Sequence, residues 1–222
     1  MTDRISPQQF HDARGTEDWR VVGDGACAFF RTGSFAASAR LVQAISELAG
    51  IEDHRPDVDI RLGGVTVRLL TRGDDYYGMS ENDVELARQI SVVAREQAAS
   101  ADPSSVQSLI VIVGSLVPAE VMPFWRAVLG YQERPDSPEE DLVDPSDRQP
   151  GFWFETMDAP RPDGGGAIHI GVWVPPDQAE TRVAAALAAG GRIVRDTYAP
   201  AWWTLADAMG NEADVATTTG RD

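Results

Sequence analysis

The sequence contains no lysine, so all 19 of its cationic side chains are arginine. Without a lysine amine, the chain cannot form a Schiff base, anchor pyridoxal phosphate or build a Walker-type phosphate loop. Cationic residues are also outnumbered, because 35 aspartates and glutamates bring the formal net charge to −16. Binding of nucleic acid or of an anionic membrane needs a basic surface. We therefore expect neither nucleic acid nor membrane as a partner.

Cysteine and long apolar runs are equally scarce. Cys27 is the only cysteine, so a disulfide within the chain is excluded, and a lone thiol is typical of a reducing compartment. No apolar run approaches the ~18 residues that span a bilayer. The N-terminal residues lack the basic-then-apolar pattern of a signal peptide. These features predict a cytoplasmic protein.

The 222 residues, 43% of them hydrophobic, suffice for one large domain or two small ones. A small, polar stretch around Pro103 separates a helical pattern from the apolar run at residues 109–113. Such composition favours a linker. We predict a first domain at 1–98, a linker at 99–106 and a second domain at 107–222.

Helix caps and glycine turns punctuate the first domain. Serines at positions 6, 34 and 80 each precede a helical pattern, and Asp83 completes a capping box after Ser80. Glycine-containing turns at 23–25 and 63–64 predict two hairpins. The pattern predicts an α+β fold in which helices cover one antiparallel sheet.

The second domain presents one order of elements twice. A strand, an amphipathic helix and further strands are expected first over residues 109–155 and again over residues 167–217. Between them, the acidic, proline-containing stretch 136–147 predicts a mobile loop. The repeated order predicts two successive β-α-β-β-β modules.

The triplet His54-Arg55-Pro56 follows a helical pattern, and Gly78 to Asp83 lead into the last helix of the first domain. With the hairpin between them, these motifs resemble pterin-4a-carbinolamine dehydratases over residues 19–97. The resemblance implies lyase chemistry with His54 and Asp83 as catalytic residues, and a ligand pocket that includes Pro56. Arg55 and Arg72 occupy positions where the family has histidines.

The two arginines change the expected chemistry. Dehydration moves protons at the pterin 4a carbon and the adjacent ring nitrogen, which suits imidazole. A guanidinium stays protonated and is a poor base, but it binds anionic groups through paired hydrogen bonds. Arg55 and Arg72 therefore predict weakened turnover and a cationic, ligand-binding pocket. In the alternative, both arginines only pair with neighbouring acids.

Residues 124–131, His169 to Val172 and the segment Asp207 to Glu212 carry a second resemblance. They resemble the glyoxalase and bleomycin-resistance group, the vicinal-oxygen-chelate superfamily. That resemblance implies paired β-α-β-β-β units that form a cupped sheet around a small-molecule site.

The second resemblance also implies ligand positions. Glu155, His169 and Asp214 match three metal positions of the superfamily, but no side chain matches the first. A divalent metal is therefore one reading of this set, and the alternative is a histidine and two acids without metal. Trp153, Trp173 and Trp203 are expected to stack a flat ligand, or else to pack within the core.

Taken together, the two resemblances predict a dehydratase-like lyase fused to a glyoxalase-like domain, with a small-molecule ligand of pterin-like type. They also imply a homo-oligomer. The alternative function is non-catalytic: the protein binds, sequesters or senses an aromatic or anionic metabolite. A third option is an interaction module for a protein partner.

Overall fold

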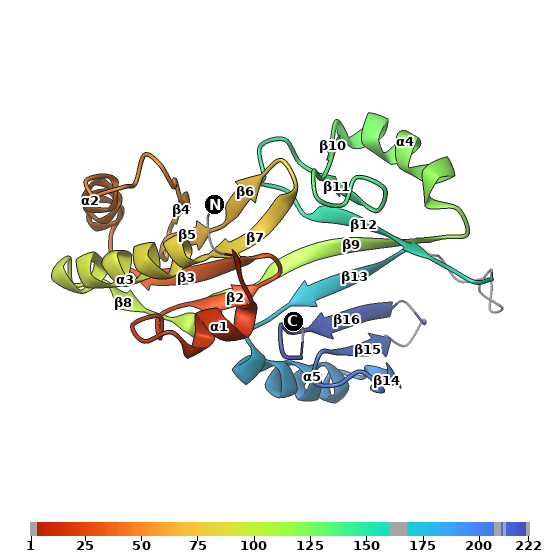
Figure 1. Cartoon of the computed structure of the whole chain (residues 1–222). Coiled ribbons are helices and arrows are strands. Elements are labelled where there is room, and N and C mark those ends of the chain that lie inside the picture. The colour runs from red at the N-terminus through yellow and green to blue at the C-terminus, as the bar shows by residue number, and fades with distance from the viewer. Residues whose placement is uncertain (1–3, 160–167, 207–209, 211, 221–222) are drawn as a thin grey trace. The chain divides into compact units, whose positions relative to one another are not determined.

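The computed structural model describes residues 4–159, 168–206, 210 and 212–220. The chain divides into two compact units, which are considered separately (Figure 1). Unit 1 comprises Met1–Val106 with Thr218–Asp222, and unit 2 comprises Gln107–Thr217. In the described part of the chain, no helix is long and apolar enough to cross a membrane.

Unit 1 is an α+β structure with two antiparallel sheets, where the sequence predicted one. The larger sheet has the strand order β2-β3-β5-β4, with β8 also paired to β3, and the smaller has the order β1-β7-β6. Its helices are α1 (Pro7–Asp12), α2 (Phe35–Ser46) and α3 (Glu81–Glu96). Its strands are β1 (Arg4–Ile5), β2 (Arg20–Val22), β3 (Gly25–Arg31), β4 (Asp57–Arg61), β5 (Gly64–Leu69), β6 (Thr71–Gly73), β7 (Tyr76–Ser80) and β8 (Ser100–Ala101).

The predicted caps start the helices of unit 1. The Ser6 hydroxyl accepts a hydrogen bond from the Gln9 amide at 3.2 Å, and the Gln9 side chain accepts one from the Ser6 amide at 2.7 Å. Ser34 accepts from the Ala37 amide at 3.1 Å. These bonds satisfy amides that no helical carbonyl reaches. The serine pattern therefore located these helix starts correctly.

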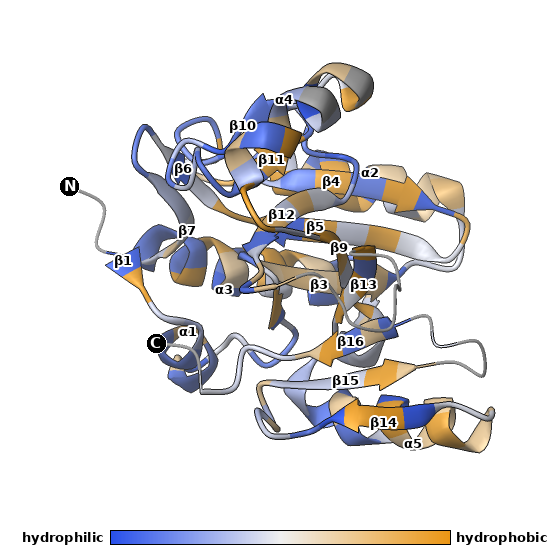
Figure 2. Ribbon diagram, turned by 90° about the vertical axis from the view of Figure 1, so that its right-hand side faces the viewer, coloured by the Kyte–Doolittle hydropathy of each residue, from blue (hydrophilic) through white to orange (hydrophobic). Residues whose placement is uncertain are grey.

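Strand alternation and one tryptophan organise the core of unit 1. Along β4, hydrophobic and hydrophilic residues alternate (Figure 2); Ile60 packs against the core beside Val65 of β5, whereas Val58 is exposed. Trp19 is fully buried, and its indole N–H lies 3.2 Å from the Ala87 carbonyl and 3.0 Å from the Ser91 hydroxyl. These bonds join the chain before β2 to helix α3.

The segment predicted as a linker, 99–106, is instead part of unit 1. Its strand β8 pairs with Phe30 and Arg31 of β3. Asp102 accepts hydrogen bonds from the hydroxyls of Ser104 and Ser105 and pairs with Arg31; these contacts hold its pKa well below the usual range. Backbone pairing and the Asp102 contacts therefore fix a stretch whose composition indicated flexibility.

Unit 2 is built on a single eight-stranded sheet with the order β10-β11-β12-β9-β13-β16-β15-β14. The first module consists of β9 (Ser108–Ser115), α4 (Pro118–Leu129), β10 (Gln132–Glu133), β11 (Asp141–Val143) and β12 (Gly151–Thr156). The second consists of β13 (Ile168–Trp173), α5 (Ala179–Ala188), β14 (Arg192–Arg195), β15 (Trp202–Ala206) and β16 (Glu212–Ala216).

The predicted repeat is visible in the strand pairing of unit 2. In each module the first strand pairs parallel with the last, β9 with β12 and β13 with β16. The two modules meet where β9 and β13 pair antiparallel. Both modules therefore have the same internal order, and their first strands lie together at the centre of the sheet.

The acidic stretch 136–147 is not the uniform loop that its composition predicted. It contains β11, which pairs with β10 and β12. Leu142 on β11 is completely buried in a cluster with Phe154, Met122 and Val113. One apolar side chain thus anchors an otherwise polar segment to the sheet.

We predict that Leu142→Ala lowers the free energy of unfolding by about 2–5 kcal/mol, because it leaves a cavity in this cluster. Leu116→Ala is the control, since that side chain is 51% exposed and its change should stay within about 0.5 kcal/mol. Chemical denaturation followed by tryptophan fluorescence measures both values. Equal losses for the two variants would contradict the placement of β11.

Candidate functional site

The first turn of α3 holds a buried carboxylate. Asp83 has no solvent exposure, and its Oδ2 accepts hydrogen bonds from the Ser80 amide at 2.7 Å and the Thr71 hydroxyl at 2.8 Å. The Ser80 hydroxyl lies 3.1 Å from the same oxygen. A buried carboxylate is costly unless donors of this kind surround it. The Asp83 side chain therefore links helix α3 to strands β6 and β7 through hydrogen bonds.

His54 lies against the other oxygen of this carboxylate. Its Nε2 is 2.5 Å from Asp83 Oδ1, and its side chain is 17% exposed. Among the described residues, Nδ1 has no hydrogen-bond partner. When Nε2 carries the ring proton, its N–H donates a hydrogen bond to Asp83, and Nδ1 can accept a hydrogen bond. The structure thus brings together the two residues predicted to be catalytic.

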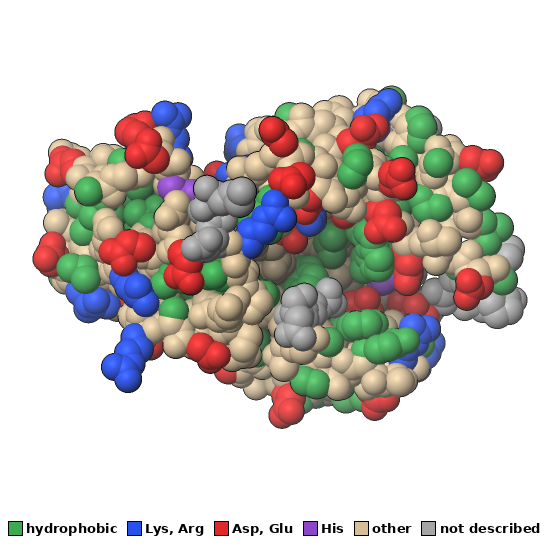
Figure 3. Space-filling view, in the orientation of Figure 1, with side chains coloured by type: hydrophobic (Ala, Val, Ile, Leu, Met, Phe, Trp, Pro, Cys, Tyr) green, Lys and Arg blue, Asp and Glu red, His purple; other side chains and the backbone are tan. Residues whose placement is uncertain are grey.

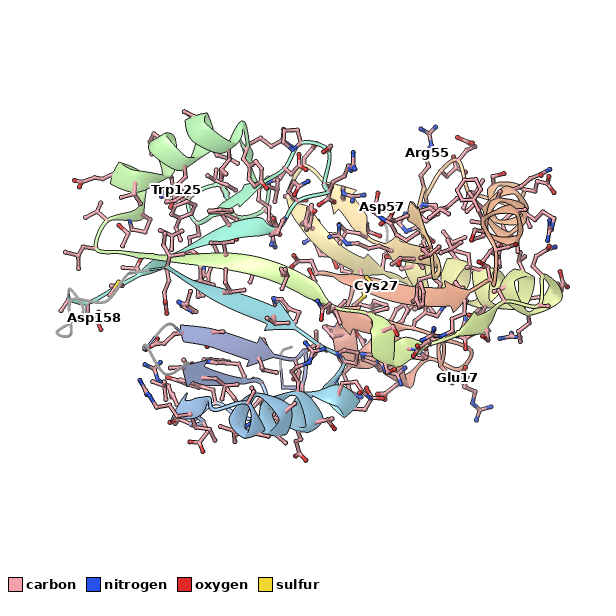
Figure 4. The ribbon with its side chains drawn as sticks, turned by 180° about the vertical axis from the view of Figure 1, so that it is seen from behind. Glu17, Cys27, Arg55, Asp57, Trp125 and Asp158 are labelled. Carbon is pink, nitrogen blue, oxygen red and sulfur yellow. The ribbon has the colours of Figure 1, made fainter. Side chains whose placement is uncertain are left out.

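Arg55 does not join this pair. Its Nη2 lies 2.8 Å from Glu52 Oε2, its side chain is 74% exposed, and it points away from the body of unit 1 (Figure 4). The structure has the alternative arrangement, in which Arg55 pairs with a neighbouring acid. Pro56, the next residue, is half-buried.

Arg72 also has an acidic partner. Successive side chains of a strand point to opposite faces, and Thr71 points toward Asp83. The Arg72 guanidinium instead lies 2.7 Å from Asp57 Oδ2 and 5.8 Å from the centre of the Tyr77 ring. Arg68 lies 3.7 Å from the same Asp57 oxygen. Each of the two predicted pocket arginines therefore has its own acidic partner, Glu52 for Arg55 and Asp57 for Arg72.

The two faces of the unit 2 sheet differ. Phe154 and Val113 pack in the cluster with α4, while Val215 and Leu205 pack in the cluster with α5. Residues of opposite parity lie on the other face, here called the open face. The strand register assigns the following residues to the open face: Trp153, Ile112, His169, Gly171, Trp173, Asp214, Ala216, Trp202 and Thr204.

The predicted tryptophans divide between these faces. Trp153 and Trp173 share the open face with His169, whereas Trp203 packs in the α5 cluster and cannot stack the same ligand. Trp202 takes the open-face position instead. Trp125 packs against Phe152, with ring centres 5.5 Å apart, as expected of a core residue.

His169 and Asp214 form a second histidine–aspartate pair. The His169 Nε2 lies 3.3 Å from Asp214 Oδ2. Burial lowers the pKa of His169, but the hydrogen bond and charge of Asp214, with the charges of Glu155 and Glu212, outweigh burial and raise it. Asp214 Oδ1 is buried without a hydrogen-bond partner among the described residues.

The residues expected to bind metal do not fit a metal site. Within the described ranges, no three His, Cys, Asp or Glu side chains are placed to hold an ion. His169 and Asp214 contact each other, while Glu155 is exposed and influences His169 through its charge. Zinc and similar ions require three or four donors around one point. The expected triad of Glu155, His169 and Asp214 therefore does not form a metal centre.

Two sequence families match the chain in separate segments. The family described as "Pterin 4 alpha carbinolamine dehydratase" matches residues 3–93, and the "Glyoxalase-like domain" family matches residues 110–216. A relative named as a putative pterin-4-alpha-carbinolamine dehydratase from Nocardia farcinica is 36% identical over 95 residues, which cover 98% of that protein and 42% of this chain. The chain therefore belongs to the pterin-4-alpha-carbinolamine dehydratase family through unit 1, and it carries a glyoxalase-like domain in unit 2.

Two further proteins extend the comparison. A relative from Haloarcula marismortui with the same name is 32% identical over 91 residues, covering 96% of its length and 41% of this chain. A solved glyoxalase/bleomycin resistance protein/dioxygenase superfamily member from Vibrio splendidus 12B01 aligns with 15% sequence identity and a TM-score of 0.32. That alignment covers 50% of this chain and 99% of that chain.

The sequence did not single out the hydroxyls that hold Asp83 or the role of Trp202. Thr71 and Ser80 lie 2.7 Å apart through their hydroxyls, on strands joined by one short hairpin. The capping box was the signal for Ser80. Trp202 and Trp203 are neighbours on one strand and point to opposite faces, but the sequence does not tell which of them faces away from the helix.

We predict that Asp214→Asn lowers the pKa of His169, because it removes the carboxylate that favours imidazolium. A raised histidine pKa stabilises the fold below the unfolded-state value, and this stabilisation is lost as pH rises through the folded-state value. NMR titration of the imidazole resonances measures the shift, with His169→Gln to assign the signal. Glu180→Gln, on helix α5, is the control and should leave the titration unchanged; the same downward shift in both variants would contradict the pairing.

Proposed function

We propose that unit 1 is a dehydratase-type lyase for a pterin 4a-carbinolamine, with weakened turnover, and that unit 2 binds a small molecule. The observation that carries this proposal is the contact between His54 and the buried Asp83. A carboxylate held by fixed donors orients an imidazole, which is the group that this chemistry needs. Family membership supplies the substrate class.

The reaction uses His54 in two roles. Protonated His54 delivers its proton to the hydroxyl that leaves the 4a carbon, so that water departs and a cationic ring remains. Neutral His54 then takes the proton of the adjacent ring nitrogen, which restores both the ring double bond and the imidazolium. Asp83 stabilises the imidazolium and keeps the ring in one orientation.

Turnover is weakened because the His54 imidazole alone must carry out proton transfers that the family divides among three histidines. The other two positions carry Arg55 and Arg72, whose guanidinium groups stay protonated. They are paired with Glu52 and Asp57, which lowers their capacity to bind a substrate anion.

A second candidate is non-catalytic, in which the protein sequesters or senses an aromatic metabolite. The open face of unit 2 favours it, because Trp153 and Trp173 share that face with His169 and Asp214. Binding that survives loss of turnover would distinguish this function from lyase activity.

We expect His54→Ala to lower dehydration by on the order of 10²-fold or more, because a general acid–base group is lost. Ligand binding should persist, because the change removes one side chain and leaves Asp83 with its hydrogen bonds from Thr71 and Ser80. Stopped-flow absorbance with enzymatically generated 4a-hydroxytetrahydropterin measures the rate. His11→Ala is the matched control. An unchanged rate in His54→Ala would refute the lyase proposal.

The double variant Arg55→His with Arg72→His should raise turnover, by on the order of tenfold or more, because it restores titrating groups at both family positions. Arg61→His is the control, since Arg61 is an exposed arginine paired with Asp59. The same stopped-flow assay compares all three proteins. If the native chain already matches an intact family member, the idea of weakening is wrong.

A further inference from the structure

The two oxygens of the Asp83 carboxylate have different partners. Oδ1 lies against the Nε2 of His54, while Oδ2 accepts hydrogen bonds from the Ser80 amide at 2.7 Å and the Thr71 hydroxyl at 2.8 Å. The Ser80 hydroxyl lies 3.1 Å from Oδ2 and 2.7 Å from the Thr71 hydroxyl. Amides and hydroxyls all have a proton to donate to this oxygen. The donors on Oδ2 therefore determine how the plane of the carboxylate is held against His54.

These donors differ in their distance from Asp83 along the chain. Ser80 directly precedes α3 and belongs to the same capping box as Asp83, so its amide and hydroxyl move with the first turn of the helix. Thr71 lies twelve residues before Asp83, on β6. Among the described partners of Oδ2, the Thr71 hydroxyl is thus the one that ties the carboxylate to a distant part of the chain.

The strand that carries Thr71 is held in place by other contacts. Thr71 pairs with Gly78 in the hairpin of β6 and β7. The Tyr76 ring packs over Gly78, where an added Cβ would lie 2.8 Å from the phenol oxygen, and the Tyr76 hydroxyl donates to the Met79 carbonyl at 2.5 Å. The hairpin therefore presents the Thr71 hydroxyl from a fixed position and does not depend on Asp83 for its own structure.

His54 has a second ring nitrogen that a ligand can reach. Its Nδ1 has no hydrogen-bond partner among the described residues and is not one of their buried unpartnered atoms, so it is open to solvent. Figure 3 shows histidine surface, in purple, in the region of β4, with acidic and basic side chains beside it. A rotation of the Asp83 carboxylate about its Cβ–Cγ bond would move Oδ1, and the hydrogen-bonded Nε2 would follow. The direction of Nδ1 therefore depends on the plane of the carboxylate.

We propose that Thr71 is a positioning residue of the lyase site: its hydroxyl fixes the plane of the Asp83 carboxylate and thereby the direction in which His54 presents Nδ1. The role in turnover rests on the function proposed for unit 1. This role is separable from folding, because Asp83 Oδ2 and the Ser80 hydroxyl still have each other, and Oδ2 keeps the Ser80 amide, when the Thr71 hydroxyl is removed. No buried polar group of this cluster then lacks a partner.

The substitution Thr71→Val removes the hydroxyl and keeps the branched shape of the side chain. We expect kcat for dehydration to fall by on the order of tenfold with KM nearly unchanged, because a misdirected imidazole still admits the substrate but transfers protons poorly. Thr71→Ser should restore most of the rate, because it returns the hydroxyl. Thr66→Val on β5 is the matched control, since the Thr66 hydroxyl bonds to no described residue. Stopped-flow absorbance with 4a-hydroxytetrahydropterin measures kcat and KM.

A spectroscopic measurement tests the positioning without turnover. The proton in the short hydrogen bond between His54 and Asp83 should give a resonance far downfield in the proton NMR spectrum, and His54→Gln assigns this resonance by its loss. The native chain, Thr71→Ser and Thr66→Val should retain the resonance. Thr71→Val should lose it, because a loosened hydrogen bond exchanges its proton with water.

Absence of the resonance from the native chain would overturn the inference, as would a Thr71→Val variant that keeps either the resonance or the native rate. Equal rate losses in Thr71→Val and Thr71→Ser would also overturn it, because the hydroxyl would then be irrelevant. A resonance that depends on Thr71, in a chain without measurable dehydration, would remove the lyase proposal alone. If circular dichroism shows that Thr71→Val does not fold, Thr71→Cys replaces it with the same expected results, since a thiol donates only weakly.

Discussion

The buried Asp83 carboxylate is the constraint on which unit 1 depends. Its partners come from three places in the chain: His54 after α2, Thr71 at the start of β6, and Ser80 at the end of β7. Loss of the carboxylate would leave buried donors unsatisfied and free the first turn of α3. The smaller sheet and the orientation of the imidazole are therefore set by the same hydrogen bonds, so a change at Asp83 affects stability and chemistry together.

Local interactions explain which parts of the fold were predictable. Serine caps and the glycine turn at 63–64 act over a few residues, so the sequence pattern contains them. The order of the two modules followed from repeated hydropathy. Short strands such as β8 and β11 were missed, because two or three residues carry little pattern and distant partners decide their pairing. The second sheet of unit 1 was missed for the same reason.

The sequence predicted which residues belong to the site, but not the directions in which their side chains point. The family motif identified His54 and Asp83, and the structure brings them into contact. The same motif placed Arg55 in a pocket, but the side chain competes for partners and pairs with Glu52 three residues earlier. Similarly, Trp202 and Trp203 are consecutive residues of the same type, and only the register of β15 decides which one lies on the open face. Side-chain direction follows from tertiary pairing, which a motif does not contain.

The two histidine–aspartate pairs show how the surroundings of a carboxylate decide its use. In unit 1 both oxygens of Asp83 are occupied, one by His54 and the other by a backbone amide and hydroxyls. Such a carboxylate holds an imidazole and has no capacity left for a ligand. In unit 2 one oxygen of Asp214 faces His169, while the other is buried without a donor among the described residues. The first arrangement suits proton transfer by a fixed ring, whereas the second leaves one carboxylate oxygen buried without a donor beside an imidazole whose pKa the carboxylate raises.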